Sequence, residues 1–92
     1  MKYEIIRTSR FKRDFKLATK RGCDLSILYK VIEILASGEK LPDSFNDHSL
    51  QGNYKGYREC HIQPDWLLIY KINESVLVLT LYRTGNHSGL FR

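Results

Sequence analysis

Long apolar runs are absent from this chain, which excludes a helical membrane span. No stretch approaches the roughly 20 consecutive apolar residues that a transmembrane helix needs. The N-terminal segment MKYEIIRTSRFKRDF interrupts its apolar residues with Glu4 and Arg7, so we do not expect a signal peptide. Together these features predict a cytoplasmic protein.

Cysteine is scarce, and its spacing matches no metal-binding motif. Cys23 and Cys60 are the only two cysteines and lie far apart in the sequence, whereas zinc-binding cysteines occur in closely spaced pairs. We therefore expect reduced thiols, and we expect Cys60 to pack as a small apolar residue. No repeat, low-complexity segment or linker interrupts the sequence, so residues 1–92 are predicted to form a single domain.

Positive charge is abundant and concentrated in the N-terminal part of the sequence. Residues 1–21 contain eight of the fifteen lysine and arginine residues but only two of the ten acidic residues. Lys12, Lys16 and Lys20 recur every four residues, which places them on one side of a helix. Such a basic face suits a polyanion or an acidic protein partner, although a charged stripe is equally typical of an ordinary solvent-exposed helix.

Hydrophobic periodicity predicts a strand followed by two amphipathic helices. The strand covers residues 2–7. The first helix is predicted to begin after an N-cap at Ser9 and to end at Gly22. Asp24 is the predicted cap of the second helix, which ends at residues 37–38. Each helix has an apolar stripe that needs a further surface to cover, and the later part of the chain supplies it.

That later part reads as a connecting loop and three strands. Residues 39–53 lack any sustained period and are predicted to form the loop. The strands are predicted at residues 54–62, 66–72 and 76–84, and the short links between them suit antiparallel hairpins. We therefore predict an α+β fold of order β-α-α-β-β-β, in which the two N-terminal helices pack on an antiparallel-rich twisted sheet.

All three histidines of the chain flank this predicted hairpin and the tail that follows it. His48 lies in the loop, His61 near the end of a strand, and His87 in the tail shortly after Arg83. Asp65 lies in the turn after His61, where a carboxylate can orient an imidazole ring. The turn can hold two or three residues, so the sequence leaves open whether His61 shares a sheet face with the tryptophan that follows the turn.

Cleavage of RNA matches these residue types. The nucleophile is the 2′-hydroxyl of the RNA itself, so a protein needs only a base, an acid and a cation around the scissile phosphate. Histidine can take either proton-transfer role near neutral pH, and Arg83 supplies fork-shaped donors for the phosphate. Tyr54, Tyr57, Trp66 and Phe91 are candidates for stacking against bases. The sequence thus predicts an endoribonuclease that needs no cofactor.

Several of these residues also have purely structural interpretations. Trp66 and Tyr70 are aromatic residues of predicted strands, which are more often part of a core than a platform for bases. Arg83 has Glu59 and Asp65 as candidate ion-pair partners.

Two other functions remain open at this point. The three histidines His48, His61 and His87 are enough ligands for a zinc site, although no closely spaced histidine pair supports such a site. A non-catalytic RNA- or ribosome-binding module would use the same basic and aromatic surface, with the histidines as structural residues.

The C-terminal half of the sequence resembles YafQ-type toxins of the RelE superfamily. The resemblance lies in DHSLQG at residues 47–52, KGYR at 55–58, HIQPDW at 61–66, LIYK at 68–71 and RTG at 83–85, with His87 and Leu90-Phe91 beyond them. The helical half agrees in order and charge, so the resemblance covers nearly the whole chain. It implies a RelE-like fold and a ribosome-dependent mRNA interferase of a bacterial type II toxin–antitoxin system.

The resemblance also implies partners and residue roles. Such toxins cut mRNA in the ribosomal A site without a metal, and a cognate antitoxin of the DinJ type inhibits them. Catalytic roles are implied for His48, His61, Asp65 and His87, assisted by Arg83 and Phe91. We favour His87 as proton donor to the leaving group and His61 as the base, oriented by Asp65. His48 would contact the phosphate or share the base role, and the basic first helix would rest on ribosomal RNA.

Overall fold

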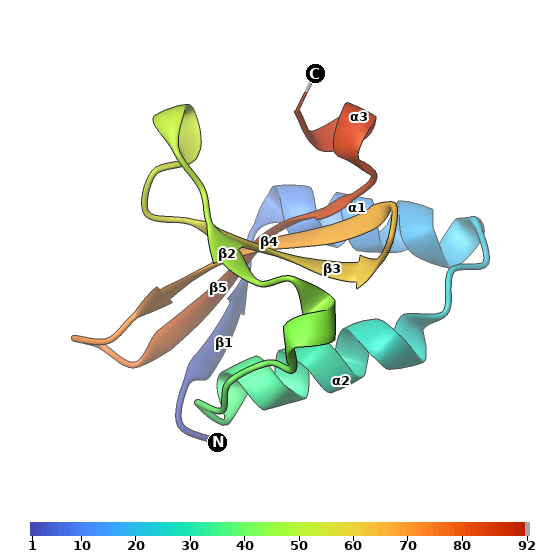
Figure 1. Ribbon diagram of the computed structural model, residues 1–92. Coiled ribbons are helices and arrows are strands. Elements are labelled where there is room, and N and C mark those ends of the chain that lie inside the picture. Colours follow the sequence, from blue (N-terminus) through green and yellow to red (C-terminus); the bar gives the residue numbers. More distant parts are fainter. Residues whose placement is uncertain (92) are drawn as a thin grey trace.

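The computed structural model describes residues 1–91 and contains one five-stranded sheet (Figure 1). The elements in chain order are β1 (Glu4–Arg7), α1 (Ser9–Lys20), α2 (Leu25–Ala36), η1 (Asp43–Phe45), β2 (His48–Ser49), η2 (Gly52–Tyr54), β3 (Arg58–Gln63), β4 (Trp66–Asn73), β5 (Val78–Gly85) and α3 (His87–Leu90), where η marks a 3₁₀ helix. The strand order across the sheet is β1-β5-β4-β3-β2; β1 is parallel to β5 and the other pairs are antiparallel. The predicted α+β fold is confirmed.

The first helix begins one residue differently from the prediction. Ser9 is the first residue of α1, and the N-cap is Thr8, whose hydroxyl accepts a hydrogen bond from the Phe11 amide at 3.0 Å. The same hydroxyl donates to the Tyr82 carbonyl oxygen at 2.7 Å. Thr8 is the N-cap because its hydroxyl forms a hydrogen bond with a free backbone amide of the first turn of α1 and also links the start of the helix to β5. The cap predicted for α2 is confirmed, since the Asp24 carboxylate accepts from the Ser26 amide at 3.0 Å.

Two predicted strands begin later in the structure. β5 begins at Val78, because Val76 and Leu77 belong to the turn after β4 and are exposed. Leu77 has a φ of 55°, a left-handed conformation that no apolar pattern indicates. β3 begins at Arg58, because the residues before it form η2 and a turn.

The predicted loop and tail contain short elements of their own. Residues 39–53 include η1, the two-residue strand β2 and the start of η2. The tail forms α3, which begins after Asn86, whose side chain accepts a hydrogen bond from the Gly89 amide at 2.8 Å. These elements are too short for periodicity to reveal, yet they carry two of the three histidines.

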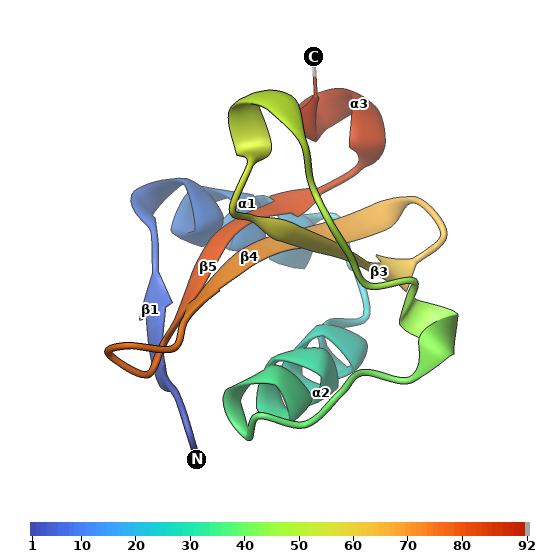
Figure 2. The same cartoon turned by 60° about the vertical axis from the view of Figure 1, so that its left-hand side comes forward.

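The sheet separates two apolar clusters. The larger one lies between the sheet and the helices α1 and α2 and includes Phe11, Leu28, Leu68 and Leu79. The smaller one covers the other face, where Leu67, Ile69 and Leu90 are buried beneath Leu50, Tyr54, Tyr57, Tyr82 and Phe91. Figures 1 and 2 show α2 on one side of the sheet and η2 with α3 on the other. Cys60 is fully buried, as predicted. Of the helices described, none is long and apolar enough to cross a membrane.

Candidate active site

Two histidines share one buried carboxylate on the face of the sheet that α2 does not cover. His48 of β2 lies opposite Glu59 of β3, and His61 follows Glu59 by two residues, so all three side chains lie on the same face. Glu59 Oε1 lies 3.3 Å from His48 Nε2 and 3.7 Å from His61 Nε2. The two ring centroids are 6.3 Å apart. Glu59 is only 5% exposed, so its carboxylate interacts with the two imidazoles rather than with bulk water.

The strand that carries His48 is held in place by its neighbour Asp47. The Asp47 carboxylate accepts hydrogen bonds from Arg58 Nε and Nη2, at 3.3 and 3.0 Å, and from the Tyr70 hydroxyl. His48 Nδ1 lies 2.8 Å from the carbonyl oxygen of Asn46. These contacts fix both the backbone and the ring of His48, although β2 itself has only two residues.

The buried Tyr70 hydroxyl predicts a loss of stability in alkaline solution. Burial, and then the hydrogen bond to Asp47, raises the pKa of Tyr70 well above its ordinary value. The folded state therefore holds this proton more tightly than the unfolded state. Above about pH 10 the free energy of unfolding should fall by up to about 1.4 kcal/mol per pH unit for this group.

Urea unfolding at about pH 8 and about pH 11 measures this effect. We expect Tyr70→Phe to lose less stability between the two pH values than the wild type does. Part of the pH dependence of stability that remains in Tyr70→Phe is due to the Cys60 thiol, because burial raises the pKa of this thiol to about 12. Tyr29→Phe is the matched control, because Tyr29 is 54% exposed. Equal slopes in the wild type and in both variants would contradict the prediction.

Arg83 on β5 is oriented by a residue of α1. Its Nε and Nη2 donate to the two carboxylate oxygens of Asp14 at 2.9 and 3.0 Å, and the Thr84 amide donates to the same carboxylate at 3.1 Å. The ion-pair partner is therefore Asp14, not Glu59 or Asp65 as considered from the sequence. The hydrogen bonds that Arg83 donates to Asp14 raise the pKa of Arg83. Within residues 1–91, Nη1 of Arg83 makes no hydrogen bond and remains available to a phosphate.

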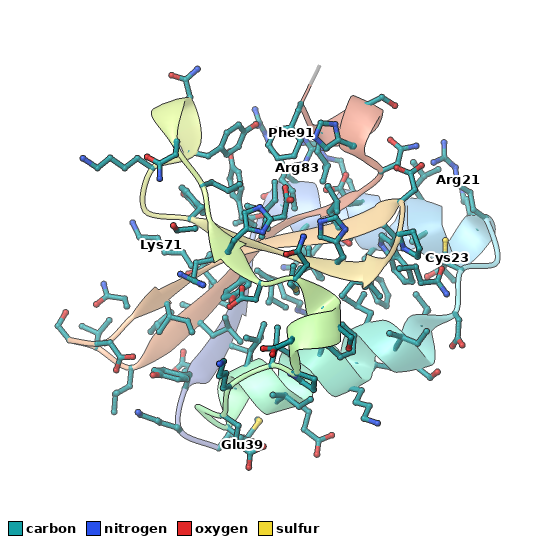
Figure 3. The ribbon with its side chains drawn as sticks, viewed as in Figure 1. Arg21, Cys23, Glu39, Lys71, Arg83 and Phe91 are labelled. Atoms are coloured by element: carbon teal, nitrogen blue, oxygen red, sulfur yellow. The ribbon has the colours of Figure 1, made fainter. Side chains whose placement is uncertain are left out.

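The third histidine lies on α3, over the same face of the sheet as His48 and His61. His87 is exposed, and its ring lies 5.0 Å from that of Phe91, centroid to centroid. Phe91 in turn packs 5.3 Å from the ring of Tyr54 in the smaller apolar cluster. Figure 3 shows Arg83 and Phe91 on the α3 side of the sheet.

The strand register gives the spacing between the histidines. His61 lies opposite Leu67 of β4, and Leu67 lies opposite Gly85 of β5, which directly precedes α3. Neighbouring strands are about 4.8 Å apart, so the backbones of His61 and Gly85 are about 10 Å apart. The structure thus brings His48 and His61 together and places His87 across β4 from them.

Asp65 and Trp66 do not join this arrangement. Asp65 is exposed and makes no hydrogen bond or ion pair within residues 1–91; the acid in contact with His61 is Glu59. Trp66 is buried in the larger cluster, and its indole N–H donates to the Thr84 hydroxyl at 2.8 Å. His61 therefore lies on the opposite face of the sheet from Trp66, whose ring is not available to stack on a base.

Comparison with known proteins agrees with the resemblance. The family described as "Bacterial toxin of type II toxin-antitoxin system, YafQ" matches residues 3–92. The chain belongs to the YafQ family. The mRNA interferase toxin YafQ of Escherichia coli K12 is 41% identical over 85 residues, which is 91% of this chain and 90% of that protein.

Two solved structures of bacterial toxins have the same fold. The toxin in a crystal structure of the Escherichia coli DinJ-YafQ complex has a TM-score of 0.90 and 40% identity, covering 98% of this chain and 99% of that one. A metal-bound toxin from Helicobacter pylori has a TM-score of 0.91 and 43% identity, covering 97% of this chain and 99% of that one. The fold and the family of this chain are thus established together.

The basic helix of this YafQ-family chain has two differently oriented sets of cations. The exposed residues Lys12, Lys16 and Lys20 lie roughly opposite Asp14 around the helix, so they point away from Arg83. Arg10 and Arg13 instead line a small hollow together with Asp14 and Arg83. The four-residue spacing that indicates the lysines does not indicate these two arginines, which lie nearer the candidate site.

The two acids that position the site were also missed from sequence. Glu59 precedes His61 by two residues in a predicted strand, and this spacing indicates that the two side chains lie on the same face of the sheet. Asp14 gave none, because 69 residues separate it from Arg83. In residues 1–91 no three His, Cys, Asp or Glu side chains are arranged to hold a metal ion. Of the three histidines considered above as zinc ligands, His48 and His61 contact Glu59, whereas the ring of His87 packs against Phe91.

Proposed function

We propose that this chain is an mRNA interferase toxin, a ribosome-dependent endoribonuclease that cleaves mRNA in the ribosomal A site by acid–base catalysis without a metal. The family and the name of its 41% identical relative support endoribonuclease activity on mRNA. The observation that supports the mechanism is the placement of three imidazoles and one guanidinium around a single face of the sheet. Cleavage of the message within the ribosome stops translation, which accounts for toxicity.

The proposed reaction is a transfer within the RNA backbone. His61 takes the proton of the 2′-hydroxyl as that oxygen bonds to the adjacent phosphorus. The bond from phosphorus to the 5′-oxygen breaks, and His87 gives its proton to that oxygen. Arg83 donates to the non-bridging oxygens, where negative charge accumulates. The products are a 2′,3′-cyclic phosphate and a 5′-hydroxyl, so both protons and the phosphate are accounted for.

The remaining residues position the ring and the substrate. Glu59 orients His61, the role predicted above for Asp65. His48 shares the same carboxylate and contacts the phosphate or shares the base role. Tyr57 and Phe91 hold RNA from the aromatic side of the sheet, since both are partly exposed there.

The partners follow from the same proposal. A DinJ-type antitoxin is the inhibitory partner, supported by the complex formed by the related Escherichia coli toxin. The ribosome and its mRNA are the targets, which places the active protein in the cytoplasm. A non-catalytic ribosome-binding module is the alternative, and it predicts no strand cleavage at all.

The test of the mechanism is the chemistry of the cleaved ends. Purified toxin is mixed with ribosomes programmed with a short end-labelled message. We expect 2′,3′-cyclic phosphate and 5′-hydroxyl ends, at a rate unchanged when the toxin has been treated with a chelator and assayed with added Mg²⁺ to preserve the ribosome. A rate restored only by zinc or another transition metal would contradict the metal-free route.

The lysine stripe of α1 predicts how binding responds to salt. We expect Lys12, Lys16 and Lys20 changed together to Glu to weaken ribosome binding and to flatten its salt dependence, because each phosphate contact contributes about 0.7–0.9 to the slope of log affinity against log salt. Sedimentation with ribosomes at several salt concentrations measures this. Lys2, Lys30 and Lys40, which are exposed and lie outside α1, give a control with the same charge change. Equal slopes in the two triple variants would rule out docking through α1.

A further inference from the structure

Three arginine side chains line one hollow at the edge of the candidate active site. Arg10 and Arg13 of α1 border it together with Asp14 and Arg83, and its volume is about 260 Å³. A water molecule takes about 30 Å³ of the liquid, so the hollow has room for a phosphate group and several waters. Its walls come from segments that are distant in the sequence and meet because α1 packs against β5.

The hollow continues the row of active-site residues across the sheet. His48 lies opposite Glu59, and Glu59 lies opposite Ile69 of β4. Ile69 in turn lies opposite Arg83 of β5. Neighbouring strands are about 4.8 Å apart, so the backbones of Glu59 and Arg83 are about 10 Å apart. Arg83 therefore lies between the histidine pair and the hollow.

The first turns of α1 occupy the edge of β5 on the far side of Arg83. β1 pairs only with the first half of β5. Beyond it, the Tyr82 carbonyl oxygen accepts a hydrogen bond from the Thr8 hydroxyl at 2.7 Å. The Thr84 amide donates to the Asp14 carboxylate at 3.1 Å. Figures 1 and 2 show α1 beside β5. The helix thus holds its arginines at the end of the row.

The hollow has an excess of positive charge. The charges of Asp14 and Arg83 compensate each other through their ion pair. Arg10 and Arg13 are exposed and form no ion pair within residues 1–91. Arg10 Nη1 lies 3.5 Å from the Tyr82 hydroxyl, so this guanidinium reaches the aromatic side of the sheet. Two guanidinium charges remain, and an anion bound between them compensates both.

The position of these arginines in α1 also favours an anion. Arg10 is the second residue of the helix and Arg13 the fifth, and the first turn contains no acidic residue. The start of a helix has a partial positive charge, so basic side chains destabilise this end and anions stabilise it. Residues that reduce the stability of the free protein in this way are typical of binding sites.

We propose that the hollow binds the backbone phosphate next to the scissile one, with Arg10 and Arg13 donating to its non-bridging oxygens. This inference rests on the proposed function. Guanidinium groups match phosphate with parallel hydrogen bonds. Since Arg83 contacts the scissile phosphate and also lines the hollow, the next phosphate of the same strand reaches the two arginines. Contacts to the backbone fix the register of the message over the histidines and add no base preference.

The first test compares messages that differ by a single charge. One linkage beside the cut carries either a phosphate or an uncharged methylphosphonate, and the sugar before it is 2′-deoxy in both messages. In the wild type we expect one linkage at which the neutral group lowers kcat/KM by a factor of about ten or more. Arg10→Gln/Arg13→Gln should lower kcat/KM on the charged message by a similar factor. The neutral group should then cause little further loss, because both changes remove the same contact.

The lysine stripe of α1 gives the matched control for this test. Lys12→Gln/Lys16→Gln removes the same charge from the same helix, on the side away from Arg83. We expect this variant to keep the full wild-type ratio between the charged and the neutral message. If the arginine variant also keeps that ratio at every linkage, the inference is overturned. The Tm of the arginine variant should not fall, whereas a purely structural role of the two arginines predicts a lower Tm.

The second test needs neither ribosome nor cleavage. A 2′-O-methyl RNA trinucleotide, which has no free 2′-hydroxyl to attack the phosphate, is titrated into the toxin while the arginine Nε–H signals are followed by NMR. We expect the signals of Arg10 and Arg13 to shift. We expect Kd to rise by a factor of about ten in Arg10→Gln/Arg13→Gln, and by a smaller factor in Lys12→Gln/Lys16→Gln. Unchanged arginine signals, or equal rises in Kd, would overturn the inference. If the trinucleotide binds as expected but no message is cleaved on ribosomes, the proposed function fails while the phosphate site stands.

Discussion

Replacing His87 with alanine is expected to lower the rate of mRNA cleavage by a factor of about 10²–10⁴ while leaving the fold intact. The size is that of a general acid removed from a proton-transfer step. The fold should persist because His87 is exposed and its ring packs beside that of Phe91. The measurement is a single-turnover rate on ribosome-bound message, together with thermal unfolding of the same protein sample.

A modified substrate separates loss of the acid from loss of binding. A message whose leaving 5′-oxygen is replaced by sulfur needs no proton on its leaving group, because a thiolate is stable in water near neutral pH. We expect His87→Ala to cleave this message nearly as fast as the wild type does. Gln51→Ala, an exposed change just before η2, is the control on the normal message and should be fully active. If His87→Ala still arrests growth and cleaves the normal message at the wild-type rate, the acid role is wrong.

The secondary structure could be predicted because it depends on local patterns. The apolar stripes of α1 and α2 and the caps near their ends are encoded within a few residues, and so are the strands β3 to β5. Errors arose where one residue type suits two conformations. Leu77 belongs to an apolar run but has a positive φ, and Thr8 and Ser9 are both good caps. Choosing between such neighbours requires the tertiary contact, here the bond from Thr8 to the carbonyl oxygen of Tyr82.

The candidate site was harder to predict because its geometry is set by register. The histidines and Arg83 could be predicted as site residues from the sequence. The ion pair between Arg83 and Asp14 could not, because Asp14 lies on α1, 69 residues earlier in the chain. The shift in register between His61 and Gln63 decides that His61 faces away from Trp66. It also leaves Glu59, rather than Asp65, beside the imidazole. Adding or removing one residue in a turn moves the side chains of the following strand to the other face of the sheet. The sequence of this chain is compatible with a turn of either two or three residues, so it does not determine the face.

Replacing Glu59 with glutamine is expected to lower kcat by a factor of about 10–100 with little change in KM. The substitution keeps the shape of a side chain that is 7% exposed and removes its charge. Two imidazoles then lose the carboxylate that orients them, and a charge-assisted hydrogen bond contributes about 1.5–3 kcal/mol. Because Glu59 lies beneath the rings, substrate binding through Arg83 and the aromatic residues is preserved. Steady-state kinetics on programmed ribosomes separate the two parameters.

The same substitution tests whether His48 and His61 act as one unit. If both depend on Glu59, the effects of Glu59→Gln and His48→Ala on kcat should be smaller in combination than the product of the two single effects. Glu33→Gln, an exposed acid on α2, serves as the charge-matched control and should combine with His48→Ala without any such interaction. Strictly multiplicative effects of Glu59→Gln and His48→Ala would show that the shared carboxylate does not couple them. His61 would then be the only base that Glu59 positions, and His48 would act on the phosphate alone.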